Sequence, residues 1–239
     1  LRHTKLGYRK LAKIHGYNKL GYNVKIDDEG EKVEIKNYDF EVADTIYNST
    51  NIFSFSHVKG HIAVGFGGAI KNFGMGGVTK ETKLFMHHAS KPEIKKDKCT
   101  FCGICAEVCP FNAITVKNNS WKHSNRKCFG CGVCVDNCKN NGIVNQKENL
   151  QYLLACSCYA CVKDKNVIYI NDVNRISKLC DCDPGSGPIL CPDIGFLVSD
   201  DPVAIDMASL DLINDIKPDI FLNENKVDPY KQVKYGEEI

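Results

Sequence analysis

A doubled run of closely spaced cysteines between residues 99 and 138 constrains the fold of this chain more than any other feature. The two halves read Cys99-x-x-Cys102-x-x-Cys105-x-x-x-Cys109-Pro110 and Cys128-x-x-Cys131-x-x-Cys134-x-x-x-Cys138-Lys139. Two residues between neighbouring cysteines let the backbone curl around a compact inorganic centre. The glycines at 103, 130 and 132 let backbone amides approach that centre. The run therefore indicates a metal-binding segment.

Two such runs in tandem are typical of bacterial segments that bind two 4Fe-4S clusters, where the fourth cysteine of each run reaches the other cluster. This rule predicts that one cluster is held by Cys99, Cys102, Cys105 and Cys138, and the second by Cys128, Cys131, Cys134 and Cys109. A zinc site and a disulfide framework are the alternatives, because Cys-x-x-Cys pairs serve in both. Zinc takes four ligands, usually as two separated pairs, so a doubled run of four favours clusters.

The length of 239 residues is too great for a two-cluster segment alone. We expect an α/β domain formed by residues 1–94 and 147–239, interrupted by an α+β module resembling bacterial ferredoxins at residues 95–146. Because the chain opens at Leu1 in what reads as part of a helix, we also expect that an amino-terminal portion is missing.

Charge and cysteine usage limit the partners and the compartment. The formal net charge of +2 gives no electrostatic case for nucleic-acid binding. No apolar run is long enough to span a membrane, and no signal peptide opens the sequence. Cluster-type spacing of the cysteines indicates reduced thiolates, so we expect an oxygen-sensitive cytoplasmic protein from an anaerobic setting.

Hydrophobic spacing before the cysteine run predicts three elements. A short amphipathic helix is expected over residues 6–14, ending at Gly16. Residues 24–26 and 33–35 alternate apolar and polar side chains around the turn-forming stretch 27–30, which predicts a hairpin. Residues 51–56 read as a buried strand that delivers His57 at its carboxyl end, where α/β folds place their sites.

After the module, residues 150–162 read as an apolar helix, and residues 167–170 and 194–198 read as strands. Asp201-Pro202 is a strong helix start, with aspartate as the cap and proline in the first turn. Asp206 inside that helix faces either a site or water. The alternation of strand, loop and helix predicts that the α/β domain resumes here.

Residues 65–77 contain a dense run of glycines around Lys71 and Asn72. The spacing matches neither a P-loop nor a dinucleotide-binding loop. Backbone amides with Lys71 could hold an anion, or the glycines could only allow close packing. We propose Gly67, Gly68, Lys71, Asn72, His57 and His61 as the candidate binding residues for a small anion. Metal binding by the histidines at 57, 61, 87 and 88 is disfavoured, since no carboxylate completes a triad.

Several segments together resemble the uncharacterised iron-sulfur proteins of domain-of-unknown-function family 362. The segments are Ser56–His61, Gly65–Gly76, Cys180–Cys182, Pro192–Gly195, Ser199–Asp206 and Ala208–Leu212. The resemblance spans nearly the whole chain and implies an α/β domain interrupted by a two-cluster module. It supplies no reaction. The Cys156-x-Cys158-x-x-Cys161 group is a departure from typical members.

Six cysteines remain outside the doubled run, in two groups of three: Cys156, Cys158, Cys161, Cys180, Cys182 and Cys191. They predict a third iron-sulfur or other metal centre. The alternative is that they are buried structural thiols, as free cysteines commonly are.

The function that these patterns favour is low-potential electron transfer through two 4Fe-4S clusters, from a donor protein to an acceptor protein or to a third metal centre. A redox enzyme that reduces a small anionic substrate at the glycine-rich segment is the main alternative, and an iron-sulfur assembly factor is another. A pocket between the glycine-rich segment and the Cys180 loop would favour the enzyme.

Overall fold

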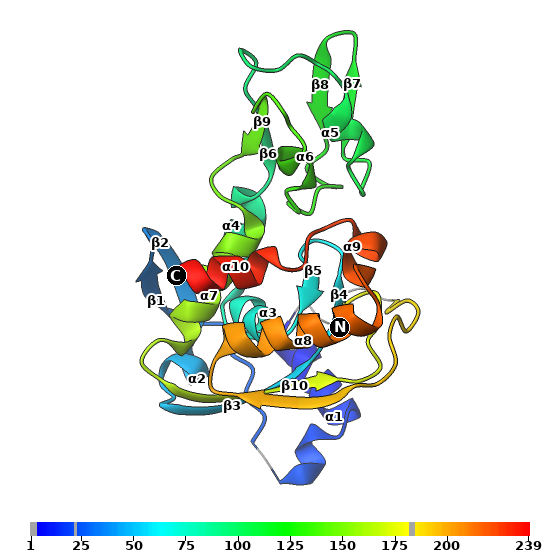
Figure 1. Cartoon of the computed structure of the whole chain (residues 1–239). Helices are drawn as coiled ribbons and strands as arrows, with labels where there is room; N and C mark the ends of the chain where they lie inside the picture. The colour runs from blue at the N-terminus through cyan, green and yellow to red at the C-terminus, as the bar shows by residue number, and fades with distance from the viewer. Residues whose placement is uncertain (1–3, 22, 182–184) are drawn as a thin grey trace.

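The computed structural model describes residues 4–21, 23–181 and 185–239. It is a mixed α/β protein built of several small sheets and surrounding helices. Figure 1 shows two parts, a larger α/β domain and a cysteine module that stands off one end of it.

The central sheet joins the chain before the cysteine module to the chain after it. Strand β3 (Asn51–His57) pairs in parallel with β10 (Asn166–Val173). Strand β10 also pairs antiparallel with β11 (Gly195–Ser199), which gives the order β11-β10-β3. The carboxyl ends of β3 and β10 therefore lie at the same edge of the sheet, next to the loops that form a pocket described below.

One face of this sheet is buried and the other is exposed. Successive strand residues point to opposite faces, so Ser54 and Ser56 are buried while Phe53 and Phe55 are 80% and 59% exposed. The rings of Phe55 and Phe196 lie side by side on the exposed face, with centroids 6.2 Å apart. The expectation of a buried strand at this position is thus correct for only one of its faces.

Helices α3 (Ala69–Gly76) and α8 (Pro202–Ile216) pack on the buried face, and α7 (Leu150–Val162) packs against α3. Helix α7 has the bounds that the sequence predicted and is almost wholly buried. Helix α8 starts where Asp201 predicted it, because the Asp201 carboxylate accepts hydrogen bonds from the amides of residues 203 and 204.

The glycine-rich segment is not a loop. It forms β5 (Gly65–Gly67) and α3, and part of its glycine content serves close packing. A Cβ atom at Gly74 would lie 2.4 Å from the carbonyl oxygen of Leu154 in α7. Because backbone cannot move aside cheaply, only glycine lets α3 and α7 approach this closely.

The first fifty residues form α1 (Lys5–Ile14), the 3-10 helix η1 (Tyr17–Leu20), and a hairpin of β1 (Gly30–Ile35) and β2 (Tyr38–Ala43). The predicted hairpin was therefore placed one strand too early. Its turn is Lys36-Asn37, where both residues have positive φ angles of 51° and 66°, as a two-residue hairpin turn requires. Residues 27 and 28 instead form side-chain contacts with Thr45 and Lys5.

Shorter elements complete the α/β domain: α2 (Asp44–Tyr47), β4 (Lys59–His61), α4 (Lys80–Ala89), α9 (Ile220–Asn225) and α10 (Lys231–Glu238). Strand β4 pairs antiparallel with β5. Throughout the described ranges, no helix is long and apolar enough to cross a membrane.

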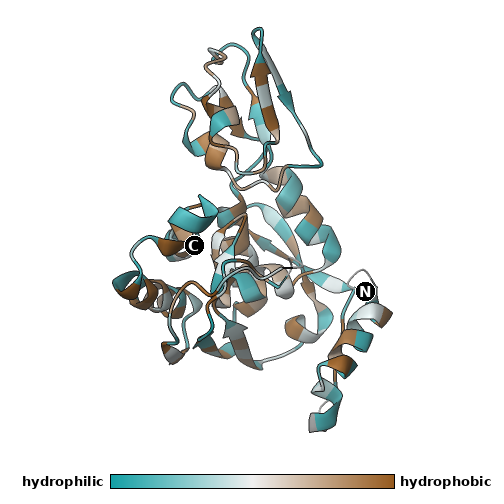
Figure 2. Cartoon of the chain, turned by 90° about the vertical axis from the view of Figure 1, so that its right-hand side faces the viewer, coloured by the Kyte–Doolittle hydropathy of each residue, from teal (hydrophilic) through white to brown (hydrophobic). Residues whose placement is uncertain are grey.

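The cysteine module contains six short elements: β6 (Pro92–Ile94), α5 (Ile104–Glu107), β7 (Ile114–Lys117), β8 (Ser120–His123), α6 (Val133–Asp136) and β9 (Ile143–Asn145). At its base β6 pairs antiparallel with β9, so the module begins and ends at one place. Figure 2 shows it from the side as a separate lobe above the domain. Its small core consists of Cys105, Ile114, Cys134 and Ile143.

Candidate iron-sulfur module and a polar pocket

The eight cysteines of the doubled run border two cavities in the module. Cys99, Cys102, Cys105 and Cys138 border a cavity of about 180 Å³. Cys109, Cys128, Cys131 and Cys134 border a second, narrower cavity. Each cavity thus takes three cysteines from one run and the fourth from the other. This is the grouping that crossed cluster ligation requires.

The backbone repeats the same conformation in both runs. Phe101 and Gly130, which precede the second cysteine of each run, have positive φ angles of 54° and 73°. Gly103 and Gly132, which follow that cysteine, have φ angles of 86° and 81°. Three of these four positions are glycine, which adopts positive φ angles without steric cost, and Phe101 is the exception.

Backbone amides point at sulfur atoms in both sets. The amide of Ala113 donates to Sγ of Cys109 at 3.3 Å, and that of Ile143 donates to Sγ of Cys138 at 3.2 Å. The Gly130 amide lies 3.4 Å from the Sγ of the first cysteine of the second run. Such bonds favour thiolates and are one way in which a protein tunes a cluster.

The thiols of the module also fit a cluster by their burial. Burial raises the pKa of Cys131 to about 12 and raises the pKa values of Cys105 and Cys134. Buried thiols of this kind become thiolates only beside a cation, which bound iron would supply. Among the described residues, no three His, Cys, Asp or Glu side chains converge as ligands of a single metal ion.

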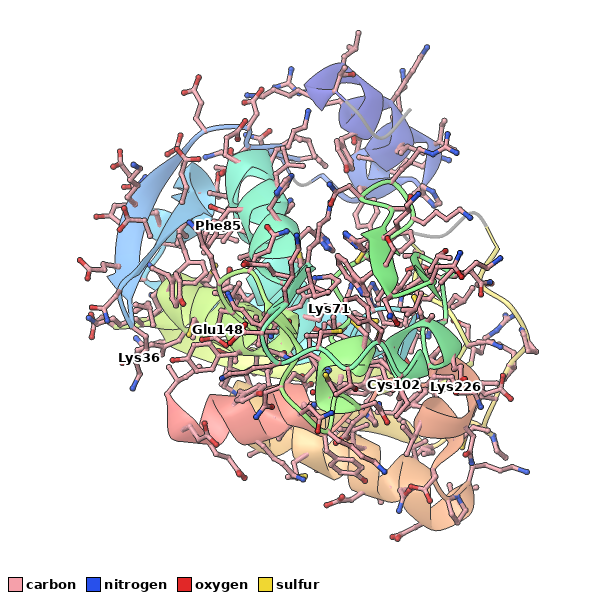
Figure 3. The ribbon with its side chains drawn as sticks, turned by 90° about the horizontal axis from the view of Figure 1, so that it is seen from above. Lys36, Lys71, Phe85, Cys102, Glu148 and Lys226 are labelled. Atoms are coloured by element: carbon pink, nitrogen blue, oxygen red, sulfur yellow. The ribbon has the colours of Figure 1, made fainter. Side chains whose placement is uncertain are left out.

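The second run packs against the α/β domain, whereas the first reaches the surface. A Cβ atom at Gly130 would lie 2.1 Å from Oγ of Ser90, and the Phe129 carbonyl oxygen lies 3.2 Å from Nδ1 of His87. In the first run Cys102 is exposed, and Figure 3 labels it in the view from above. The two cysteine sets therefore differ in environment, one towards the domain and one towards solvent.

A pocket of about 520 Å³ opens in the α/β domain between the carboxyl end of β3 and the start of α3. Five of the six proposed binding residues line it, together with residues of the Cys180 loop: His57, Gly67, Gly68, Lys71, Asn72, Cys180 and Asp181. The sixth, His61, is buried and is not a lining residue. The carboxyl end of β3, the glycine-rich segment and the Cys180 loop thus border one pocket.

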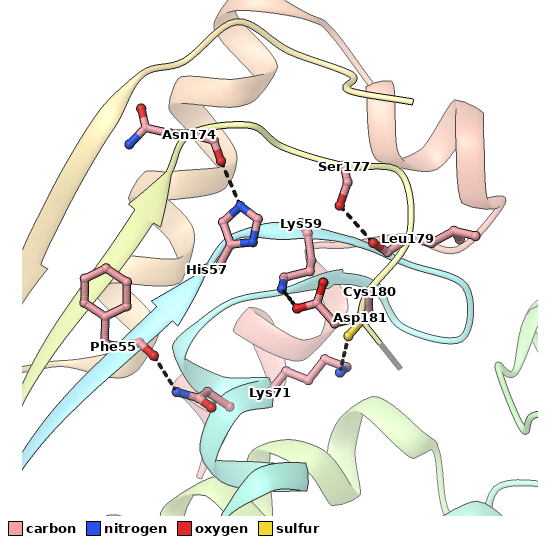
Figure 4. A network of polar contacts seen from close by, with 10 residues as sticks. Phe55, His57, Lys59, Lys71, Asn174, Ser177, Leu179, Cys180 and Asp181 are labelled. Atoms are coloured by element: carbon pink, nitrogen blue, oxygen red, sulfur yellow. Dashed lines mark hydrogen bonds and ion pairs between the residues drawn. The ribbon is translucent and has the colours of Figure 1, made fainter. Parts of the chain in front are cut away.

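Two lysines dominate the chemistry of this pocket (Figure 4). Nζ of Lys71 lies 3.5 Å from Sγ of Cys180. Nζ of Lys59 forms an ion pair with the carboxylate of Asp181. Lys59 is only 7% exposed. The pocket can therefore hold negative groups against two cations.

Neutral polar side chains complete the wall. Nδ2 of Asn72 donates hydrogen bonds to the carbonyl oxygen of Phe55 at 3.2 Å and to Oγ of Ser56 at 3.0 Å. Nε2 of His57 lies 2.8 Å from the carbonyl oxygen of Asn174. These contacts hold the side-chain amide of Asn72 and the imidazole of His57 at the carboxyl end of the sheet, as Figure 4 shows for His57.

The histidines take separate roles. Burial, and then the charges of Lys71 and His87, hold the pKa of His61 well below its ordinary value. Burial also lowers the pKa of His87. Both rings are therefore neutral at pH 7. Nε2 of His57 and Nδ1 of His87 each lie at a backbone carbonyl oxygen.

Asp206 is a structural residue of this site that the sequence left undecided. It is fully buried, and its carboxylate accepts hydrogen bonds from the amides of Ala69 and Ile70 and from Nδ2 of Asn171. These amides are the free donors at the start of α3, so Asp206 caps this helix from 137 residues away. The amides of Ala69 and Ile70 are thus already bonded to Asp206, whereas Lys59 and Lys71 present charged groups to the pocket.

The cysteines outside the module are scattered. Helix α7 buries three of them, Cys156, Cys158 and Cys161. Cys156 points away from the other two, because offsets of two and five residues place side chains on different faces of a helix. Cys191 is buried outside α7, and Sγ of Cys180 contacts Nζ of Lys71. Cys182 is outside the described residues. The third metal centre remains a prediction, and the three α7 positions resemble structural thiols.

The fold and the cysteine pattern define a mixed α/β protein with a segment similar to ferredoxins. The chain belongs to the family described as "Domain of unknown function (DUF362)", whose profile matches residues 3–211. A ferredoxin of Methanothermococcus thermolithotrophicus is 65% identical over 23 residues, which are 10% of this chain and 38% of that ferredoxin. The match spans well under half of that ferredoxin's length.

Proposed function

We propose that the chain is an electron-transfer protein that holds two 4Fe-4S clusters with crossed ligation. One observation carries the proposal, namely that each cavity in the module is bordered by three cysteines of one run and the fourth of the other. When bound, each cluster would accept and release one electron. The cytoplasm and a low-oxygen setting, expected from the free thiols, are part of the proposal.

The residues of this chain would position and tune the two centres. The eight thiolates hold the iron, and the amides of Ala113, Gly130 and Ile143 stabilise sulfur charge. The first cysteine set, with exposed Cys102, is the side that a redox partner protein can approach. The second set lies against α4 of the α/β domain through Gly130. Electrons would therefore enter at the first set and pass towards the domain.

The test is anaerobic purification followed by iron and sulfide analysis and electron paramagnetic resonance of the reduced protein. About eight irons and eight sulfides per chain, with signals of two interacting clusters, are the expected result. Stoichiometric zinc without sulfide would contradict the proposal.

A second candidate function is a redox enzyme that uses the pocket in the α/β domain. The observation that favours it is the meeting of Lys71 and His57 with the Cys180 loop around a cavity of about 520 Å³, within the range of ligand sites. A Lys71→Ala variant that keeps both clusters and loses turnover of an anionic substrate would support the enzyme.

A further inference from the structure

Lys59 is an unusual residue for the wall of an open pocket. It lies in β4 and is 7% exposed, yet its partner Asp181 has a side chain that is 69% exposed. A buried ammonium needs a nearby anion, and a solvent-exposed carboxylate is a weak one because water screens it. The site therefore keeps a cation whose partner in this structure is replaceable.

Lys71 has the same kind of partner on the same segment. Its Nζ lies 3.5 Å from Sγ of Cys180, the residue immediately before Asp181. Two consecutive residues thus place a sulfur and a carboxylate at the two lysines, as Figure 4 shows. Both lysines thus contact hydrogen-bond acceptors, and the oxygens of a small dianion are acceptors of the same kind for an ammonium group.

The rest of the wall is consistent with a negative guest. Of the described lining residues, two are lysines and one is a carboxylate, so displacement of Asp181 leaves a local charge of about +2. Oγ of Ser56 accepts from Asn72 and can therefore donate its own proton into the pocket. Asp206 already satisfies the first amides of α3, so binding falls to these side chains.

We propose that the pocket binds a small dianion, a phosphate or a dicarboxylate, between Lys59 and Lys71, and that it displaces the Cys180-Asp181 segment from these lysines. The segment is thus a built-in competitor that holds the cations when the pocket is without a guest. This inference deepens the second candidate function and rests on it, but binding is measured without electron transfer. A failure of binding and a failure of cluster assembly are therefore told apart.

The experiment is isothermal titration calorimetry on the full chain under anaerobic conditions, with inorganic phosphate and malonate as separate probes. We expect one of them to bind at one site per chain. Lys71→Gln and Lys59→Gln each weaken that binding about tenfold or more, because each removes a charge-assisted contact. Lys95→Gln, which changes a lysine paired with Glu93 in the module, is the matched control and leaves the affinity unchanged.

The variant Asp181→Asn tests whether Asp181 competes with the dianion for the lysines or helps to bind it. If Asp181 competes with the guest, its loss tightens binding about two- to fivefold, the range for an exposed ion pair. Weaker binding in Asp181→Asn would overturn the displacement. Absence of binding by both probes at millimolar concentration, or equal affinity in Lys71→Gln and the wild type, would overturn the site. Circular dichroism checks that each variant folds. If Lys59→Gln does not fold, Lys71→Gln still decides the test, because Lys71 is partly exposed and its replacement should leave the fold intact.

Discussion

Replacing Asp206 by alanine tests whether one buried carboxylate holds the glycine-rich helix in place. The substitution removes the acceptor of three N–H groups, namely the backbone amides of Ala69 and Ile70 and one of the two N–H groups of the Asn171 side chain. The other N–H group of Asn171 keeps its hydrogen bond to Ser209. Each buried donor without a partner costs about 1–3 kcal/mol. Burial raises the pKa of Asp206 from 3.8 to about 6, so removing the charge returns about 3 kcal/mol at pH 7. The resulting net loss of stability lies between about 0 and about 6 kcal/mol, and we expect a value near the middle, about 3 kcal/mol.

The assay is hydrogen exchange of the α3 amides in the cluster-loaded protein, since iron loss makes global unfolding irreversible. We expect the amides of Ala69 and Ile70 to exchange much faster in Asp206→Ala than in the wild type. The control is Asp215→Ala, which changes an exposed aspartate of α8, the helix that also contains Asp206, and should leave this exchange unchanged. A gain of opening free energy in Asp206→Ala would refute the reasoning, because even the lowest cost of three unsatisfied donors offsets the about 3 kcal/mol returned by removing the charge.

The same residue predicts a pH effect with a definite sign. Since its pKa is higher in the folded chain than the ordinary 3.8, the folded state holds the proton more tightly. The stability that Asp206 contributes is therefore full below about pH 4 and is lost as the pH rises through about 6. Asp206→Asn removes this dependence, and exchange rates of the α3 amides measured across that window check it.

Three further predictions concern the cysteines and the glycines. Cys109→Ser should remove the cluster of the second run and leave that of its own run, so iron falls from about eight to about four; loss of the first-run signal would contradict crossed ligation. Gly74→Ala should destabilise the fold by about 2 kcal/mol or more, because its Cβ would lie 2.4 Å from the oxygen of Leu154. Gly76→Ala, whose Cβ would meet nothing closer than 3.6 Å, is the control and should be neutral in thermal unfolding. If a third metal centre exists, iron exceeds about eight per chain and falls in Cys180→Ser; a count unchanged near eight would return these cysteines to structural roles.

The parts of the fold that local sequence determines were predicted well. Helix α7 has the predicted bounds because its apolar run is continuous and is followed by polar residues. Helix α8 starts at the predicted cap, since Asp201 and Pro202 act within one turn. The pairing of cysteines into two cavities also follows from a short repeated spacing.

What the sequence could not predict depends on distant residues. The contact between Asp206 and Ala69 spans 137 positions and has no local pattern. The exposed face of β3 was missed because its aromatic residues suggest burial, and only the course of the remaining chain decides which face is covered. The hairpin was misplaced because the acidic stretch looked like the stronger turn, whereas Lys36-Asn37 adopts the required positive φ.

If the module holds the proposed clusters, the pairing of β6 with β9 determines how the chain would respond to their loss. Because Pro92 lies opposite Asn145, the module is closed at its base by a two-stranded stem. A segment closed in this way adds no long open loop to the host domain, whatever the state of its interior. Strand β3 would remain paired with β10 while residues 95–142 loosen, so oxidative damage would be confined to the lobe beyond the stem and the pocket in the domain would keep its shape.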